Sequence, residues 1–310
     1  METIIFALLN GLIYGLMLFM LSSGLTLIFS MMGVLNFAHT SFYMLGAYFA
    51  YAIGAVTGFW VALFLAPILV GLIGAVIERW GIRIVHSKGP VAELLFTFGL
   101  AYIIEEVVEI TWGKLSVPYE IPAALNFPLF TIFGTNYPAY RVFMLAIAIG
   151  MLLILWFLLK RTRLGLIIQA ALSHPNMVAH LGHDVPRIFT MIFAVGCALA
   201  GLAGVIGGNY LVTEPSMAFA IGPIVFVVVV IGGLGSLEGA FIASLIIGFL
   251  QTFAIAIDTS FGTIFGFLGL SQTSELGRIT IASLAPMLPF VLLIIVLTLR
   301  PRGLFGERDF

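Results

Sequence analysis

Charged side chains are scarce in this sequence. They make up only 9% of the 310 residues and leave a net charge of −1, whereas about 25% of an ordinary soluble domain is charged. This balance excludes nucleic acid or an anionic surface as the defining partner. The only cysteine, Cys197, cannot form an intrachain disulfide, and it lies within an apolar run. We expect it to be a small packing residue.

Motifs of enzymes and of nucleotide-binding proteins are also missing. The sequence contains no G-x-x-x-x-G-K-[ST], no H-E-x-x-H and no G-x-S-x-G. We therefore predict no catalytic residue, no metal site and no cofactor bound by this chain. Three histidines close together in sequence leave a metal site as an alternative to a polar loop surface: His174, His180 and His183.

The chain is instead rich in apolar residues. Hydrophobic residues make up 62% of it, and the mean hydropathy is +1.20. A membrane-spanning helix needs about 20 apolar residues, and the backbone in lipid must satisfy its own hydrogen bonds. The alternating pattern of a transmembrane β-barrel does not occur. The sequence therefore predicts an all-α, polytopic transmembrane bundle.

The apolar runs predict eight or nine spans, because one of them is short enough to be re-entrant. We place them at 4–30, 40–56, 59–78, 91–112, 140–159, 188–212, 217–233, 239–257 and 280–299. No linker, charge run or low-complexity tract separates a second domain. Residues 1–310 are therefore expected to form a single transmembrane domain.

Lysine and arginine are distributed unequally between the two sides of this bundle. Three of the 13 fall on one side, at Lys114, Arg141 and Arg278. The other ten share the opposite side: Arg79, Arg83, Lys88, Lys160, Arg161, Arg163, Arg187, Arg300, Arg302 and Arg308. The positive-inside rule makes the second side cytoplasmic. It places the C-terminus inside and, with nine crossings, the N-terminus outside.

The longest cytoplasmic connection covers about residues 160–187. Within it, Ser173 and Gly182 predict the start and the stop of a short helix with Met177, Val178 and Leu181 as its apolar face. Asp184 followed by Pro186 predicts a second cap that begins the next span. A short amphipathic helix between two caps suits docking into a partner's groove, and a solvated connector is the alternative.

Several stretches together resemble ABC importer permeases of the branched-chain amino-acid (Liv-type) family. "GLTLIFSMMGVLNFAHTSFYMLGAY" is similar to the N-terminal signature of that family, and "RTRLG", Ala170, Ala171, "MVAHLG" and Arg187 are similar to its coupling segment. "IGGLGSLEGA" is similar to its late Gly-rich signature and "RPRGLFG" to its C-terminal ending. The resemblance covers about residues 5–306. One departure is Gln169, where the family commonly has a basic residue.

The resemblance implies a permease subunit of an ATP-driven importer for amino acids or a related small polar solute. It implies a multi-pass protein of a bacterial or archaeal cytoplasmic (inner) membrane. The expected partners are a second, related but different permease, two cytoplasmic ATPase subunits that hold ATP and Mg, and an extracytoplasmic binding protein. The residues expected to couple the chain to the ATPase are Arg161, Arg163, Gly165, Ser173, Met177, Val178, Leu181, Gly182 and Arg187.

Polar residues between the first two spans are the candidates for the translocation path. They are Asn36, His39, Ser41 and Tyr43 in "GVLNFAHTSFYMLGAY". Asn36 and His39 would either bond a neighbouring helix and end the first span, or line a water-filled path, where gating and direct substrate contact are both open.

Two further features have alternative interpretations. The Gly-rich segment contains Gly232, Gly233, Gly235 and Gly239, which we expect to allow close helix packing or a sharp turn, with Glu238 at a helix start. Glu105, Glu106 and Glu109 share the outer end of the fourth span. They are either solvated interfacial acids or the ion site of a stand-alone secondary transporter, which is the alternative function.

Overall fold

The computed structural model describes residues 2–173, 175–257, 259–260, 263 and 278–306. Its long helices follow the chain in this order: α1 (Glu2–Met32), α2 (His39–Thr57), α3 (Phe59–Ile77), α5 (Pro90–Trp112), α6 (Ala139–Arg161), α9 (Val185–Gly207), α10 (Met217–Gly232), α11 (Leu237–Ala256) and α14 (Leu288–Leu299). Shorter elements connect them: the π-helical turn η1 (Glu78–Ile82), α4 (Arg83–His86), the 3-10 turn η2 (Ala123–Leu125), α7 (Arg163–Ser173), α8 (Pro175–His180), α13 (Ile281–Leu284) and the 3-10 turn η5 (Ala285–Met287).

The all-α bundle expected from the sequence is confirmed. Each of the nine expected ranges coincides with a helix, and the last one consists of α13, η5 and α14 in succession. Among the described residues, six helical stretches are long and apolar enough to cross a membrane, and α10 is a shorter apolar helix. The remaining two, α2 and α5, have sufficient length but contain polar or acidic residues such as His39 and Glu93.

Close backbone contacts hold the centre of the bundle together. α1 packs along α11, and α9 packs against α1, α2 and α3. Glycines allow these approaches: a Cβ on Gly46 of α2 would lie 2.2 Å from the carbonyl oxygen of Gly201 of α9, and a Cβ on Gly248 of α11 would lie 2.5 Å from the Cα of Gly15. Such small-residue contacts are the usual device for packing helices in a membrane, where apolar burial gives no driving force.

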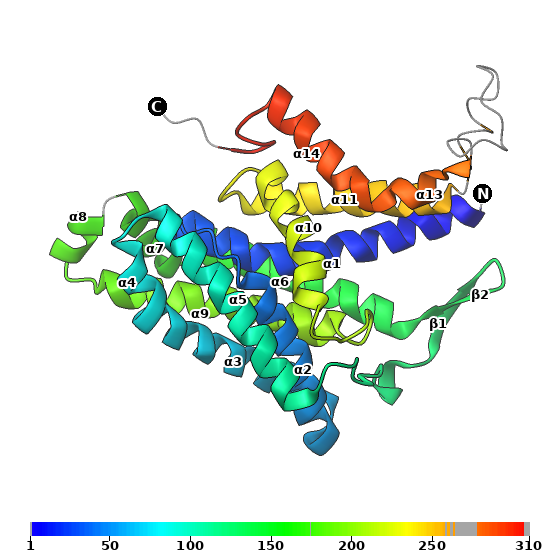
Figure 1. Cartoon of the computed structure of the whole chain (residues 1–310), viewed down its shortest axis with the longest axis horizontal. Coiled ribbons are helices and arrows are strands. Elements are labelled where there is room, and N and C mark those ends of the chain that lie inside the picture. The colour runs from blue at the N-terminus through cyan, green and yellow to red at the C-terminus, as the bar shows by residue number, and fades with distance from the viewer. Residues whose placement is uncertain (1, 174, 258, 261–262, 264–277, 307–310) are drawn as a thin grey trace.

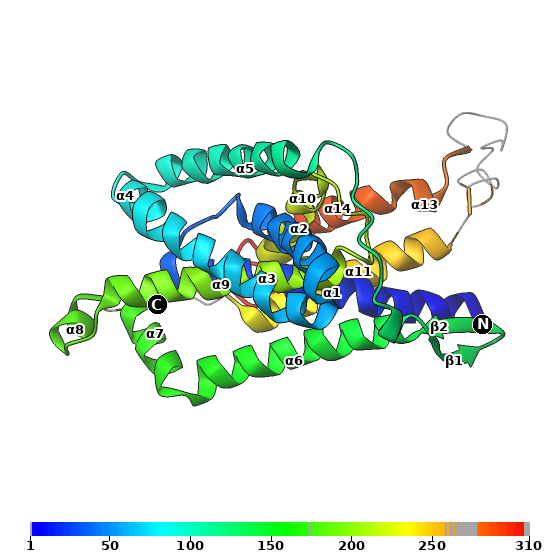
Figure 2. The same cartoon turned by 90° about the horizontal axis from the view of Figure 1, so that it is seen from below.

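The outer helices lie around this centre. Figure 2 shows α5 and α6 on opposite sides of the group formed by α1, α2, α3 and α9. Apolar side chains of α6 face outward, among them Leu153, Ile154 and Phe157, which are exposed by 56–61%. This outer surface is suited to lipid.

Cys197 lies inside the bundle, as expected. Its side chain is fully buried on α9, and a Cβ on Gly74 of α3 would come within 2.7 Å of its Sγ. The thiol thus fills the space that a glycine leaves on the neighbouring helix.

The two ends of the bundle carry different elements. Figure 1 shows α4, α7 and α8 at one end, with the last turn of α14 toward the same end, and the N-terminus with a β-hairpin at the other. The hairpin, β1 (Pro128–Ile132) and β2 (Thr135–Pro138), is antiparallel and was not expected from the sequence. Its turn residues Phe133 and Gly134 both have positive φ, as a two-residue hairpin turn requires.

The segment 160–187 also differs from the expectation of a single short helix. It contains two helices, α7 with 11 residues and α8 with six. The second begins at Pro175, and Gly182 follows it with a φ of +89°. The amide of Gly182 donates to the carbonyl of Ala179, and the amide of His183 donates to the carbonyl of Val178. This is the glycine-terminated helix end that the sequence predicts.

Candidate functional site

The first candidate region is the break between α1 and α2. α1 ends at Gly33, whose φ is +66° and whose amide donates to the carbonyl of Phe29. Asn36 then forms a tight turn, because its Oδ1 accepts from the amide of Ala38 at 3.1 Å and its carbonyl accepts from the amide of His39 at 3.2 Å. Gly33 therefore ends the first helix, and the turn at Asn36 leads into the second.

His39 connects the start of α2 back to α1. Its Nε2 lies 3.0 Å from the carbonyl oxygen of Leu21, and only a protonated nitrogen can donate to that oxygen. In the neutral ring Nδ1 is then an acceptor, and it is buried without a partner among the described residues. Gly24 makes the approach possible, since a Cβ there would lie 2.9 Å from the ring Cε1.

A cavity of about 370 Å³ opens beside this break. Its few polar residues are Asn36, His39, Thr40 and Ser41, and its walls are apolar side chains of α1, α5, α10 and α14, including Leu25, Phe98, Phe219, Phe226 and Leu293. The volume is in the range of small-molecule sites. The cavity is therefore lined mostly by apolar side chains, and the segment from Asn36 to Ser41 supplies its polar ones.

Two further polar groups at this end are buried without a hydrogen-bond partner in the described part of the chain. They are Nδ2 of Asn36 and Oγ of Ser41. Buried polar side-chain atoms nearly always have partners. Together with Nδ1 of His39, the groups left without a partner are an amide donor, an imidazole acceptor and a hydroxyl that can do either.

Phe37 forms part of the cavity wall. Its ring stacks on Phe226 of α10 with centroids 5.8 Å apart, and both residues line the cavity. Its amide donates to Oγ1 of Thr97 on α5 at 3.3 Å. The break between α1 and α2 is therefore held by both α5 and α10.

Tyr43, the fourth residue expected on the path, lies elsewhere. It does not line this cavity. It packs against α9, where a Cβ on Gly204 would meet its carbonyl oxygen and a Cβ on Gly207 would meet its hydroxyl. The structure therefore brings Asn36, His39 and Ser41 together and separates Tyr43 from them. Residues four apart on a helix, such as His39 and Tyr43, lie on the same face, so their spacing in the sequence did not predict this separation.

The second candidate region is the segment from α7 to α8. Gly165 packs against the end of α6, since a Cβ there would lie 2.2 Å from the carbonyl oxygen of Leu159. Arg161 stacks over the ring of Trp156 at 5.7 Å, and Arg163 begins α7 on the exposed surface. Ser173 ends α7 and its side chain is outside the described part of the structure, as is His174 altogether. Among the described residues no three metal-ligating side chains gather.

The apolar face expected on the short helix is divided. Val178 is only 4% exposed and packs with Ala171 and Val185, whereas Met177 and Leu181 are 67% and 77% exposed. The expectation that these three residues form one outward face was wrong for Val178. The reason is that α7, which the sequence did not indicate as a separate helix, covers that side of α8.

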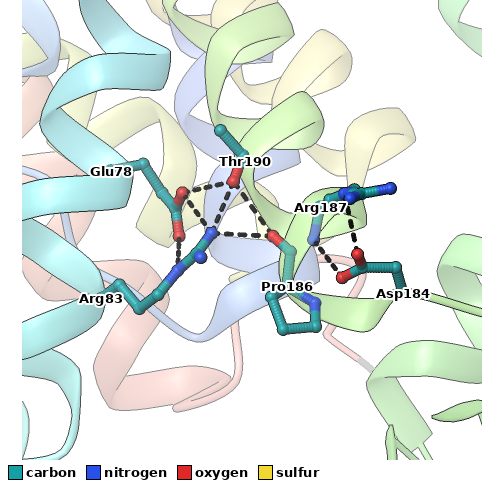
Figure 3. A network of polar contacts seen from close by, with 6 residues as sticks. All are labelled: Glu78, Arg83, Asp184, Pro186, Arg187 and Thr190. Carbon is teal, nitrogen blue, oxygen red and sulfur yellow. Dashed lines mark hydrogen bonds and ion pairs between the residues drawn. The ribbon is translucent and has the colours of Figure 1, made fainter.

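The start of α9 carries the predicted cap and an unpredicted polar cluster. Oδ1 of Asp184 accepts from the amide of Arg187 at 3.1 Å, and Oδ2 pairs with its Nε at 2.8 Å. Figure 3 shows beside this cap a second group, in which Glu78 and Arg83 meet Pro186 and Thr190 of α9. The sequence carries one signal for this group, because Glu78 and Arg83 directly follow an apolar run, and a charge that becomes buried there requires a partner.

The Gly-rich segment joins α10 to α11 and to the end of the chain. A Cβ on Gly239 would lie 2.0 Å from the carbonyl oxygen of Gly232, and Gly233 and Gly235 have φ of +103° and +88°. The amides of Leu304 and Phe305 donate to the carbonyls of Ile231 and Gly232 at 2.8 and 3.0 Å. Both expected uses of these glycines, close packing and a sharp turn, are present.

The charged residues named as alternatives lie away from the cavity. Glu238 is in the first turn of α11, as expected, and pairs with Lys160 at the end of α6. Glu109 pairs with Lys114 at 3.2 Å, and none of Glu105, Glu106 and Glu109 lines the cavity at Asn36.

Comparisons with known proteins cover nearly the whole chain. Residues 7–297 match the family described as "Branched-chain amino acid transport system / permease component". The high-affinity branched-chain amino acid transport system permease protein LivH of Escherichia coli (strain K12) is 27% identical, with 97% of this chain and 94% of LivH covered. The probable branched-chain amino acid transport permease protein LivH of Methanocaldococcus jannaschii is also 27% identical, with 96% and 91% covered. Of the solved structures, PsaBC from Streptococcus pneumoniae in complex with Fab is 11% identical, with 94% of this chain and 91% of that chain covered and a TM-score of 0.46.

Proposed function

The chain belongs to the family of branched-chain amino acid transport permease components, and on this premise we propose that it carries amino acids with apolar side chains into the cell. It is the membrane-spanning permease of an ABC importer and not the enzyme of that system. Both relatives described above are named as branched-chain amino acid permeases.

The cavity beside the break between α1 and α2 is the observation that carries the proposal. Its apolar walls suit a hydrocarbon side chain, and Asn36, His39 and Ser41 line it, each with a buried side-chain atom that has no hydrogen-bond partner among the described residues. An amide donor suits a carboxylate, and a neutral imidazole nitrogen accepts from an ammonium group. Asn36, His39 and Ser41 thus contact the solute during its passage.

The end that carries α4, α7 and α8 faces the cytoplasm in this proposal, and so does the C-terminus. The excess of lysine and arginine on this side of the spans supports the orientation. Met177 and Leu181 are exposed at the same end, where two apolar side chains suit the groove of a cytoplasmic partner. The ATPase docks on this segment, with Arg161, Arg163 and Arg187 orienting the contact.

The complete importer contains further subunits. Two ATPases bind ATP and Mg, and each needs a docking segment, of which this chain supplies one. A second, related but different permease supplies the other, and a binding protein outside the membrane delivers the solute. Subunits recovered from the native membrane would reveal this composition.

Reconstitution tests the function directly. The chain is purified with its ATPase, second permease and binding protein and placed in liposomes that contain ATP. We expect ATP-dependent uptake of leucine, isoleucine or valine, and little uptake of lysine or glutamate. Uptake by this chain alone, driven by an ion gradient, would contradict the proposal and favour a secondary transporter.

A further inference from the structure

Glu78 is an acid in an unfavourable place. It begins the π-helical turn η1 directly after the apolar helix α3 and is 1% exposed, and a buried charge requires partners. It has them: Oε1 and Oε2 accept from Nε and Nη2 of Arg83 at 3.2 and 2.9 Å, and Oε2 accepts from Oγ1 of Thr190 at 2.6 Å. Each carboxylate oxygen is therefore bonded.

The π-helical turn makes this pairing possible. Glu78 and Arg83 are five residues apart, and in an α-helix with 3.6 residues per turn such side chains point about 140° apart. Within η1 the amide of Arg83 donates to the carbonyl of Glu78, which is the i→i+5 bond of a π-helix. The wider turn brings both side chains onto one face. Single π-turns of this kind frequently occur at functional sites.

Arg83 extends the contact to α9. Its Nη2 also lies 2.9 Å from the carbonyl oxygen of Pro186 and 2.6 Å from Oγ1 of Thr190, so its two hydrogens are shared among three acceptors. We call these four residues, Glu78, Arg83, Pro186 and Thr190, the α3–α9 cluster (Figure 3). Pro186 lies in the first turn of α9, directly after α8 and the Asp184 cap. Only the four residues 181–184 connect α8 to α9. A displacement of α8 therefore acts directly on the start of α9 and on this cluster.

η1 is also connected to the cavity, through α4 and α5. Nδ1 of His86 in α4 bonds Oε1 of Glu93 in the first turn of α5. One turn later, Oγ1 of Thr97 donates to the carbonyl of Glu93 and accepts from the amide of Phe37. Phe37 and Phe98 both line the cavity.

Packing supports the same connection. A Cβ on Gly81 of η1 would lie 2.4 Å from the ring of Phe96 on α5, so the π-turn and α5 are in direct contact. The path from α8 to the break between α1 and α2 therefore consists of bonded or packed groups at every step.

We propose that Glu78, Arg83 and Thr190 are positioning residues that transmit the movement of the docking segment, through η1 and α5, to the cavity wall at Phe37. The proposal rests on the proposed function, because it requires an ATPase on α8 and a solute in the cavity. The cluster couples ATP hydrolysis to transport. When it is lost, ATP is still hydrolysed but less solute is transported for each ATP.

The test uses the complete importer in liposomes, with two variants of the cluster. Thr190→Val replaces the hydroxyl by a methyl group of similar size, and Glu78→Gln removes the negative charge and keeps the shape. Thr111→Val is the matched control, because Oγ1 of Thr111 bonds the carbonyl oxygen four residues earlier, that of Val107, just as Oγ1 of Thr190 lies 3.0 Å from that of Pro186. In the described part of the chain Thr111 has no side-chain bond to another helix. Uptake, ATP hydrolysis with and without binding protein, and the melting temperature are measured for each.

We expect both cluster variants to assemble and hydrolyse ATP while uptake per ATP falls about fivefold or more, the lower end of typical coupling energies. Thr111→Val should match the wild type. A lower melting temperature or poor assembly with unchanged uptake per ATP in the assembled fraction would overturn the proposal, since that is the effect of a merely structural bond. If Glu78→Gln fails to assemble, Thr190→Val alone decides. Failure of the proposed function is distinguishable, because the wild type itself would then show no ATP-driven uptake.

Discussion

Gly46 of α2 and Gly201 of α9 meet backbone to backbone at the centre of the bundle. A Cβ on Gly46 would lie 2.2 Å from the carbonyl oxygen of Gly201 and 2.5 Å from its Cα. No rotamer change relieves such a contact, because the atoms that are met belong to the main chain. The two helices must separate to accept any side chain here.

Gly46→Ala should therefore lower the stability of the folded protein. We expect a loss of about 1–3 kcal/mol, the usual range for an overpacked core, seen as a lower melting temperature in detergent. Gly99→Ala is the control, because Gly99 is also helical but a Cβ there meets nothing within 4 Å. Alanine favours a helix over glycine, so this variant should melt at the same or a higher temperature. Equal melting of both variants would show that α2 and α9 do not pack this closely.

Asn36 has two roles that substitution can separate. Its Oδ1 forms the turn to Ala38, and its Nδ2 is the donor proposed for the solute. Asn36→Leu should abolish uptake, since it removes both groups. Asn36→Ser keeps an oxygen that can accept at the turn and lacks the amide donor. We expect it to fold normally and to lose about tenfold or more in uptake, because a hydrogen bond to a charged group contributes about 1.5–3 kcal/mol and about 1.4 kcal/mol is a factor of ten. Full uptake by the serine variant would restrict Asn36 to the turn.

The exposed face of α8 should bind the ATPase. Met177→Asp with Leu181→Asp places two charges on side chains that are 67% and 77% exposed, so we expect each to change folding stability by less than about 0.5 kcal/mol. In a buried contact two unpaired charges cost several kcal/mol, and the ATPase should no longer co-purify. Val178→Ala is the contrasting variant. Because Val178 is buried against Ala171 and Val185, it should lower the melting temperature and leave ATPase binding intact. Wild-type recovery of the ATPase with the double variant would remove α8 from the docking site.

The end of the chain should stabilise α10. Leu304 and Phe305 donate their amides to the carbonyls of Ile231 and Gly232, and Gly239 packs against Gly232 at the same place. A chain that stops at Arg300 loses both bonds, each worth about 1 kcal/mol, and should melt at a lower temperature. Deletion of residues 307–310 alone is the control and should have no effect. If both truncated chains melt at the same temperature as the full chain, this contact does not contribute to the stability of the folded protein.

Helix positions were predictable because lipid leaves the backbone few options. A run of apolar residues in a membrane must satisfy its own hydrogen bonds, so hydropathy alone located all nine ranges. The same physics explains the caps at Asp184 and Gly182, which are local features of four or five residues. The hairpin at Pro128–Pro138 was missed because it lies between spans, where hydropathy carries no such constraint.

Contacts between distant residues could not be read in the same way. The burial of Val178 depends on α7 folding back against it, and the place of Tyr43 depends on glycines of α9 more than 160 residues later. Glu78 and Arg83 were visible as charges beside an apolar run. Their pairing required a π-turn, for which no sequence pattern was available. In each case a partner that is remote in sequence decides where the side chain points.

The burial of Cys197 has a practical consequence. The chain contains one cysteine in all, and its side chain is fully buried against Gly74. A thiol reagent applied to the folded protein therefore meets no accessible native target, and the natural sequence serves as its own unlabelled background. A cysteine introduced at an exposed position such as Met177 or Phe133 would then carry a spin label or fluorophore at one known place, at either end of the bundle, without first replacing a core residue.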